Sequence, residues 1–342
     1  MDKNKRILVT GATGFVGAYL LRYLLDRGYT NISALHRHSS PWNLVEDIRD
    51  RVTWIEGDIL DIFSLEEALD GVELLYHCAA IISMDPRDNQ LMRQVNYEGT
   101  ANVVNMALDA GVEKMLYTSS IAAIGRTKES RTIDEKYSWE RSKYNSNYAI
   151  SKYLAEQEVW RGIAEGLPAV IINPGVIIGS GFWDRGTSVM FQRVWKGLQF
   201  FPGGGSGYVD VRDVARMCLQ LMESNIAGER FIAVSENCDY KNLFTMVADS
   251  LKKGAPQYQL PNWVGELAWR LIWPVSKLTN TKPLLTREMV QMTAKTYVYS
   301  NKKSLDQLNF KYLPLLQTIQ ETGAQFLQAE AVQFRPSLLP LA

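Results

Sequence analysis

Three glycines near the start of the chain, spaced G-x-x-G-x-x-G, most constrain its fold. Gly11 follows an apolar run rich in β-branched residues, and an amphipathic segment begins directly after Gly17. This order predicts a strand, a tight turn and a helix whose unpaired N–H groups favour a pyrophosphate. Taken alone, the motif also fits a glycine-rich corner that binds nothing. The residues of this predicted phosphate loop are Gly11, Thr13, Gly14, Phe15, Val16 and Gly17.

The end of the second predicted strand, residues 32–35, is where a dinucleotide fold selects its cofactor. It continues as His36-Arg37-His38-Ser39-Ser40, without a carboxylate. An acidic side chain would bind the adenosine ribose of NAD, whereas Arg37 can pair with the 2′-phosphate of NADP. A solvated basic loop that binds no cofactor is the alternative. We therefore predict NADP(H), with NAD(H) as the second choice.

Strands and helices go on alternating, which predicts an α/β fold with a doubly wound parallel (Rossmann) sheet. Asp58 ends the third strand and is placed to accept a hydrogen bond from an adenine amino group, with Ile59 against the ring. The fourth strand ends in the small residues Cys78-Ala79-Ala80, where a cofactor can lie against the backbone. A single helix is predicted over residues 89–110.

Candidate catalytic residues follow the next strand. Ser119 and Ser120 end the strand predicted over residues 114–118, and a helix predicted to begin at Tyr148 carries Lys152 one turn later. Because positions i and i+4 share a helix face, we expect the ammonium to lie near the phenol. A nearby cation would lower the pKa of Tyr148 and let it exchange a proton near neutral pH.

Composition argues against several other classes of protein. Lysine plus arginine equals aspartate plus glutamate at 37 each, so no net charge draws the chain to nucleic acid. The cysteines Cys78, Cys218 and Cys238 and the three histidines lack metal-ligand spacing, so neither a metal nor a disulfide framework is expected. Without a signal-peptide core or a membrane-spanning apolar run, the chain is expected to be cytoplasmic.

In their order, these motifs are similar to those of the extended short-chain dehydrogenase/reductase superfamily, also called the NAD-dependent epimerase/dehydratase family. The resemblance implies that Tyr148 is the catalytic acid/base and that Lys152 binds the nicotinamide ribose. It implies that Ser120 hydrogen-bonds the substrate oxygen and that Ser119 lies nearer the cofactor. The segments that carry the resemblance are Thr10–Gly17, Gly57–Asp58, His77–Ala80, Val95–Asn96, Thr118–Ser120, Tyr148–Lys152, Asn173–Gly179 and Tyr208–Ala215. The residues implied to line the nicotinamide are Pro174, Gly175, Val176 and Ile177.

Within that family the chain is most similar to the dihydroflavonol-4-reductase group, with 3-beta-hydroxysteroid dehydrogenases nearby. Basic residues stand at 36–38, where epimerases usually carry an acid, and Ile121-Ala122-Ala123 replaces the acidic groups that sugar dehydratases place there. The resemblance therefore implies NADPH-dependent reduction of a ketone on a bulky, largely apolar substrate. Aromatic residues in the C-terminal part fit such a substrate: Phe182, Trp183, Phe191, Trp195, Phe200, Phe201, Trp263, Trp269 and Trp273.

Three alternatives stay open beside this reductase. The chain could be an NAD-dependent sugar-nucleotide epimerase that returns the hydride to the same substrate, or a 3-beta-hydroxysteroid-type dehydrogenase. It could also be a non-enzymatic sensor of dinucleotides. Such a sensor needs no acid/base residues, so the presence of Ser120, Tyr148 and Lys152 counts against this alternative. The oligomeric state stays open as well.

The predicted dinucleotide-binding domain spans residues 1–178, and residues 208–235 return to it. Residues 179–207 and 236–330 would form a smaller substrate lobe, mostly C-terminal, and residues 331–342 a docked or loose tail.

Two further segments in the predicted lobe carry structural expectations. The run Gly203–Gly207 predicts a flexible hinge or turn, or a plain surface loop. The segment Trp263–Pro274 is too short to span a bilayer and contains Glu266 and Arg270. Its three tryptophans indicate either a membrane-surface helix or, as we favour, a helix packed over an apolar pocket.

Overall fold

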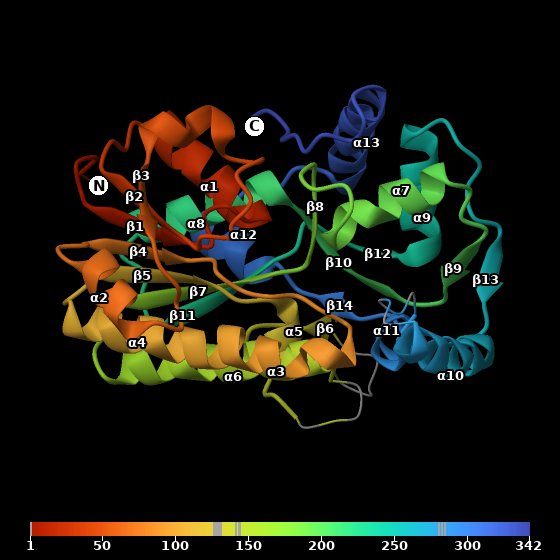
Figure 1. The fold of residues 1–342 in the computed structure, drawn as a ribbon, viewed down its shortest axis with the longest axis horizontal. Helices are drawn as coiled ribbons and strands as arrows, with labels where there is room; N and C mark the ends of the chain where they lie inside the picture. The colour runs from red at the N-terminus through yellow and green to blue at the C-terminus, as the bar shows by residue number, and fades with distance from the viewer. Residues whose placement is uncertain are drawn as a thin grey trace.

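A single sheet of seven parallel strands forms the centre of the protein (Figure 1). The computed structural model describes residues 2–125, 132–140, 142, 145–279, 281, 283 and 285–342. The strand order is β3-β2-β1-β4-β5-β7-β11, so the direction of winding reverses between β1 and β4. In open α/β sheets ligands bind at such a reversal, beyond the carboxyl ends of the strands. The strands are β1 (Ile7–Thr10), β2 (Ile32–His36), β3 (Thr53–Glu56), β4 (Leu74–His77), β5 (Lys114–Thr118), β7 (Ala169–Pro174) and β11 (Glu229–Ala233).

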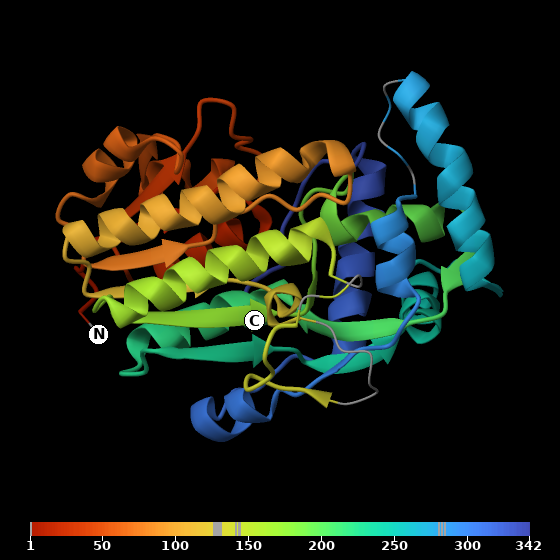
Figure 2. The same cartoon turned by 90° about the horizontal axis from the view of Figure 1, so that it is seen from below.

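Helices cover both faces of this sheet (Figures 1 and 2), which confirms the predicted doubly wound fold. Strand residues alternate between the two cores: Ile7 and Val9 pack with α1 and α8, whereas Leu8 packs with α2, α4 and α6. Both faces are apolar because both are buried. The covering helices are α1 (Phe15–Asp26), α2 (Ile62–Leu69), α4 (Gly99–Asp109), α6 (Asn147–Ala164) and α8 (Val211–Glu223).

The helix predicted over residues 89–110 is present and runs to Asp109, but its middle is a π-helical turn that the sequence did not predict. It consists of α3 (Asn89–Met92), a π-helical turn η3 (Arg93–Glu98) and then α4. Within the widened turn, the Thr100 hydroxyl donates a hydrogen bond to the Asn96 carbonyl at 2.6 Å. Such π turns often occur at functional sites.

A smaller lobe lies beyond the carboxyl ends of the main strands (Figure 1). Its core is aromatic, with Trp183 edge-on to Phe326 at 5.1 Å and Phe191 buried beside them. The lobe contains the sheet β12-β10-β8 and the pair β13-β9. Its strands are β8 (Val176–Ile178), β9 (Phe200–Pro202), β10 (Gly205–Asp210), β12 (Glu236–Asp239) and β13 (Tyr258–Leu260). Its helices are α7 (Val189–Trp195), α9 (Tyr240–Ser250), α10 (Asn262–Leu278), α11 (Arg287–Thr293) and α13 (Leu315–Ala331).

Short elements complete the described chain. They are β6 (Thr132–Ile133), which pairs with β14 (Val298–Tyr299), together with α5 (Ile121–Ile124), α12 (Lys302–Leu308), η1 (Glu46–Arg51), η2 (Pro86–Asp88) and η4 (Gly186–Ser188).

The glycine run Gly203–Gly207 is not a hinge, because its last three residues begin β10. A Cβ on Gly204 would lie 2.2 Å from the carbonyl oxygen of Lys295, and one on Gly205 would lie 2.7 Å from that of Cys238. Real Cβ atoms do not approach backbone so closely. These glycines therefore allow neighbouring backbones to pack, and the hinge prediction was wrong.

The last residues of the chain are docked rather than loose. Leu339 is buried, and its amide donates to the Tyr19 hydroxyl in α1 at 2.8 Å. The amide of Ala342 donates to the hydroxyl of Tyr23 at 3.0 Å. The tail therefore covers the outer side of α1.

Of the aromatic residues noted in the lobe, some are part of its core and others are exposed. Trp183, Phe191 and Phe201 are buried, whereas Phe200 and Trp263 are exposed. No helix among the described residues is long and apolar enough to cross a membrane.

Candidate active site

The glycines of the phosphate loop lie at positions where two backbone segments pack closely together. Gly11 has the left-handed φ of +68°, and a Cβ there would lie 2.6 Å from the Ala79 nitrogen at the end of β4. A Cβ on Gly17 would lie 2.3 Å from the Gly11 carbonyl oxygen. Gly14 is the N-cap of α1 and supplies no side-chain cap. The first turn of α1 thus leaves its N–H groups uncovered by side chains, an arrangement that fits the pyrophosphate of a dinucleotide.

A buried histidine fixes the reversal point between β1 and β4. The His77 ring lies 2.7 Å from the Thr10 hydroxyl through Nδ1 and 3.0 Å from the Thr100 hydroxyl through Nε2. Burial lowers the pKa of His77 to about 3, so the ring is neutral at physiological pH. The contacts position the strand ends that carry Gly11 and Cys78-Ala79-Ala80.

Asn96, in the π turn, joins the loop after β4 to α6. Its amide nitrogen donates to the Ile81 carbonyl and the Ser151 hydroxyl, both at 2.9 Å, and its amide oxygen accepts from the Ile81 nitrogen at 2.7 Å. Ser151 in turn donates to the carbonyl oxygen of Tyr148 at 2.8 Å. Asn96 therefore ties the segment after Ala80 to the helix turn that bears Tyr148.

Ser120 and Tyr148 come together from different elements. Ser120 is the N-cap of α5, where its hydroxyl accepts from the Ala122 nitrogen at 3.2 Å. Tyr148 lies in the first turn of α6, which Ser146 caps. Burial raises the pKa of Tyr148, and a hydrogen bond with the Ser120 side chain partly opposes that rise. A raised pKa keeps the phenol protonated at neutral pH, so Tyr148 is a potential proton donor.

Lys152 is buried one turn further along α6, and its hydrogen bonds are made to residues of β5. Its Nζ donates to the Tyr117 hydroxyl at 2.7 Å and to the Thr118 carbonyl at 3.0 Å. Burial lowers the pKa of Lys152 to about 7, against the opposing charge of Glu156. The prediction that the ammonium lowers the pKa of Tyr148 was therefore wrong for this structure, because burial of the phenol dominates.

A buried polar network beneath Ser120 was missed by sequence reasoning. Glu156 accepts hydrogen bonds from the Ser119 hydroxyl at 2.6 Å and the Asn173 amide at 2.7 Å, and pairs with Arg230 at 3.0 Å. Asn173 also donates to the Ser120 carbonyl at 3.0 Å. The hydroxyl of Ser119 thus bonds to Glu156. The only sequence signal for this network was that Glu156 lies four residues after Lys152, on the same face of the helix.

The predicted adenosine end lies at the carboxyl ends of β2 and β3. The Arg37 side chain is exposed, and its backbone nitrogen donates to the Ser40 hydroxyl at 2.9 Å. Asp58 is half-buried and accepts from the Leu60 nitrogen at 3.0 Å, whereas Ile59 is buried against Gly99. Arg37 after β2 and Asp58 after β3 lie at the same edge of the sheet as the phosphate loop.

The segment predicted to line the nicotinamide crosses from the main sheet into the lobe. Pro174 ends β7, and Val176 and Ile177 begin β8 half-buried. A Cβ on Gly175 would lie 2.5 Å from the Gly207 carbonyl oxygen, so only glycine fits at this crossing.

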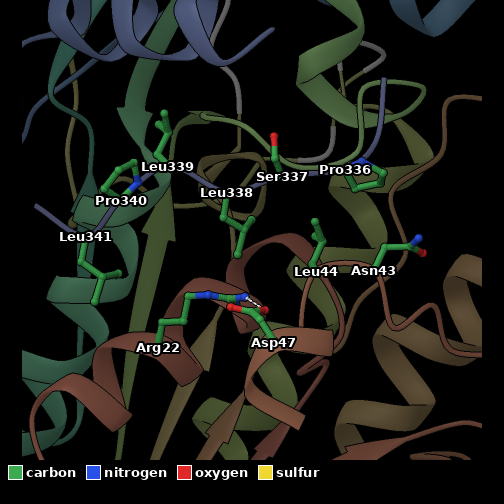
Figure 3. A pocket seen from close by; sticks show the side chains of 10 residues that line it. All are labelled: Arg22, Asn43, Leu44, Asp47, Pro336, Ser337, Leu338, Leu339, Pro340 and Leu341. Atoms are coloured by element: carbon green, nitrogen blue, oxygen red, sulfur yellow. Dashed lines mark hydrogen bonds and ion pairs between the residues drawn. The ribbon is translucent and has the colours of Figure 1, made fainter. Parts of the chain in front are cut away.

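A cavity of about 440 Å³ lies away from these residues (Figure 3). Figure 3 shows Leu338 directed toward the ion pair of Arg22 and Asp47, with Leu44 on the other wall. The C-terminal tail, α1 and the loop before η1 enclose it. It contains none of the predicted site residues.

Comparison with known proteins agrees with the motifs. The model of the NAD dependent epimerase/dehydratase family matches residues 7–233. The chain is 30% identical over 323 residues to "Putative dihydroflavonol 4-reductase" of Synechocystis sp., covering 91% of each chain. It is 28% identical over 331 residues to cinnamoyl-CoA reductase 1 of Petunia hybrida, covering 92% of this chain and 90% of that one.

Solved structures share the whole fold. The structure of gox2253 superposes with a TM-score of 0.81 at 31% identity, covering 95% of this chain and 98% of that one. DesIV from Streptomyces venezuelae, a dTDP-glucose 4,6-dehydratase solved with NAD and TYD, superposes with a TM-score of 0.77 at 19% identity, covering 96% and 98%. The chain is therefore an oxidoreductase-type enzyme that belongs to the NAD-dependent epimerase/dehydratase family.

Proposed function

We propose that this enzyme uses NADPH to reduce a ketone on a bulky, largely apolar molecule, in the manner of dihydroflavonol-4-reductase. The observation that carries the proposal is that Ser120 just after β5 and Tyr148 in the first turn of α6 come close enough for the Ser120 side chain to influence the pKa of Tyr148, with Lys152 one helical turn beyond. The curated relatives at about 30% identity are named as reductases, which supports reduction over epimerisation.

The two hydroxyl groups divide the work at the carbonyl oxygen. A nicotinamide cofactor, when bound, supplies the hydride. Ser120 donates a hydrogen bond to the oxygen as negative charge develops, and Tyr148 donates the proton that completes the alcohol. Burial keeps Tyr148 protonated, which suits reduction. Lys152 would bind the ribose, with Tyr117 and Thr118 holding its ammonium between them.

The choice of NADPH rests on the end of β2. The exposed Arg37 and the hydroxyl of Ser40 are groups that recognise a phosphate, and the run His36–Ser40 contains no carboxylate to accept from a ribose. We propose that Arg37 pairs with the 2′-phosphate.

A substrate panel tests this function. Flavanonols, steroid ketones, simple aryl ketones and UDP- or dTDP-sugars would be compared by oxidation of NADPH. We expect turnover of at least one apolar ketone and none of the nucleotide sugars. Conversion of a nucleotide sugar by enzyme purified with tightly bound NAD would instead establish the epimerase.

A further inference from the structure

The outer end of the lobe carries large apolar side chains on its surface. Along α10, Trp263, Leu267 and Leu271 recur every four residues and are 70%, 53% and 65% exposed. Phe200 of β9 and Tyr258 of β13, the strand that precedes α10 in the chain, are also exposed, with ring centroids 5.8 Å apart. We call these five residues the lobe-edge patch. Large apolar side chains exposed together at one end of a molecule often mark a binding surface.

The exposure follows from how α10 is packed. The helix carries apolar residues on two sides. Its inner side packs against α11 at Gly265, where a Cβ would lie 3.0 Å from Val290. The spacing of four places Trp263, Leu267 and Leu271 together on the opposite, outer side. Figures 1 and 2 show α10 at the extreme edge of the molecule, at the end opposite α2. The inner side of this helix therefore packs on α11, whereas its outer side carries exposed apolar side chains.

Charge distinguishes this segment from the rest of the chain. Residues 261–295 contain five lysines and arginines but only two glutamates, in a protein whose overall net charge is zero. Both acids are engaged locally: Glu266 accepts from Trp269 and pairs with Arg270, and Glu288 accepts from Asn147. In sequence, the segment that contains α10 is therefore both aromatic and basic.

We propose that the lobe-edge patch rests on the surface of an anionic lipid bilayer. Tryptophan and tyrosine favour the boundary between headgroups and acyl chains, and an amphipathic helix with nearby lysine and arginine lies in that plane. Each basic residue near an anionic surface adds to the attraction. At 17 residues α10 presents a face about 25 Å long, enough to lie on a membrane.

A second copy of the chain fits the patch less well. In a two-fold dimer the same patch would face itself, which would bring two basic segments together at the interface. A bilayer containing anionic lipid has the opposite charge. The inference does not depend on the proposed reaction, because it concerns a surface outside the Ser120 and Tyr148 site.

Vesicle binding tests the proposal with the full-length protein. Sedimentation with vesicles of 30% phosphatidylglycerol in phosphatidylcholine would be compared with pure phosphatidylcholine. We expect binding to the anionic vesicles that weakens with added salt, because screening reduces the attraction. Trp263→Ser should reduce the partition coefficient by about tenfold, and Arg270→Gln by severalfold.

Phe63→Ser is the matched control, because Phe63 is 82% exposed on α2 at the opposite end of the molecule. Thermal melting confirms that each variant folds, and turnover of a soluble ketone should stay unchanged in all of them. Equal binding by wild type and Trp263→Ser would overturn the proposal, as would no binding to anionic vesicles. So would a dimer in sedimentation equilibrium that Trp263→Ser converts to a monomer.

Discussion

The ammonium of Lys152 lies 2.7 Å from the hydroxyl of Tyr117 and 4.4 Å from the centre of the same ring. Tyr117 belongs to β5, next to the strand ends of the candidate site. The contact offsets part of the cost of burying the Lys152 ammonium, since hydroxyl, carbonyl and ring all interact with its charge. The hydrogen bonds of the ammonium therefore go to Tyr117 and Thr118 of β5.

Removing the hydroxyl of Tyr148 should abolish chemistry and spare cofactor binding. Tyr148→Phe takes away only the proton donor, so kcat should fall by roughly 10²–10⁴ while the Kd for NADPH stays within about twofold. Stopped-flow hydride transfer and fluorescence titration measure the two separately. Tyr153→Phe, on the same helix, is the control and should keep normal turnover. A near-normal rate in Tyr148→Phe would remove this residue from the mechanism.

Lys152 should make the free energy of unfolding depend on pH. Its pKa is about 7 in the folded protein and near 10.5 when unfolded, so between these values the unfolded state binds more protons. Wild type therefore gains stability as pH rises from about 7 toward 10. Lys152→Met lacks this gain, so its stability relative to wild type should fall by about 2–3 kcal/mol between pH 6 and pH 9.

Urea unfolding at four pH values measures that difference. Lys196→Met, at an exposed lysine, serves as the control and should show a constant offset. A relative stability that is flat or rises with pH would contradict the lowered pKa of Lys152 in the folded protein.

Arg37 should set the preference for NADPH over NADH. One charge-assisted bond to a phosphate contributes about 1.5–3 kcal/mol, so Arg37→Ala should lower the NADPH/NADH ratio of kcat/KM by roughly ten- to hundredfold. Arg51→Ala removes a nearby exposed charge at the end of η1 and should change the ratio little. Equal kcat/KM for both cofactors in wild type would defeat the prediction before any variant is made.

Much of the fold followed from local pattern, because glycine spacing and apolar strands encode the sheet directly. Both ends of β5 and the start of the helix bearing Tyr148 were predictable to within a residue. The π turn at Asn96 was not, since it depends on Ile81 and Ser151, which are distant in sequence. The glycines before β10 resemble a hinge in sequence, and only tertiary contact with Cys238 and Lys295 shows that they permit packing.

Glu156 illustrates the same limit within the candidate site. A glutamate in mid-helix is ordinarily a solvated residue, yet here Arg230, 74 positions away, neutralises it in the core. Sequence spacing from Lys152 could suggest the position but not the partner.

Neutralising Glu156 should destabilise the fold more than it affects the cofactor. Glu156→Gln leaves the guanidinium of Arg230, whose side chain is 17% exposed, without its carboxylate. Breaking a fully buried pair costs about 3–5 kcal/mol, so we expect a loss near the lower end of that range. The control is Glu158→Gln, which disturbs a more exposed pair with Arg161 and should cost less than about 1 kcal/mol. Denaturant unfolding measures both. Similar losses in the two variants would mean that the network contributes little.

The last prediction concerns Tyr19, whose hydroxyl joins the C-terminal tail to the lobe. It accepts from the Leu339 amide at 2.8 Å and donates to the Ser180 carbonyl at 2.9 Å. Tyr19→Phe leaves both buried groups unpaired, and deletion of residues 339–342 removes the amide and the buried Leu339 side chain. Each change should destabilise the protein by about 2–3 kcal/mol.

Because the two changes share one hydrogen bond, their effects should not add. We expect a coupling of at least 0.5 kcal/mol, on the order found for contacting groups, so that the double variant loses less than the sum. Tyr29→Phe is the control, since its hydroxyl donates to Glu223 instead, and its effect should add to that of the deletion. Urea unfolding of the four proteins in each cycle measures the coupling. Additivity for Tyr19 within about 0.3 kcal/mol would show that the tail acts only by covering apolar surface.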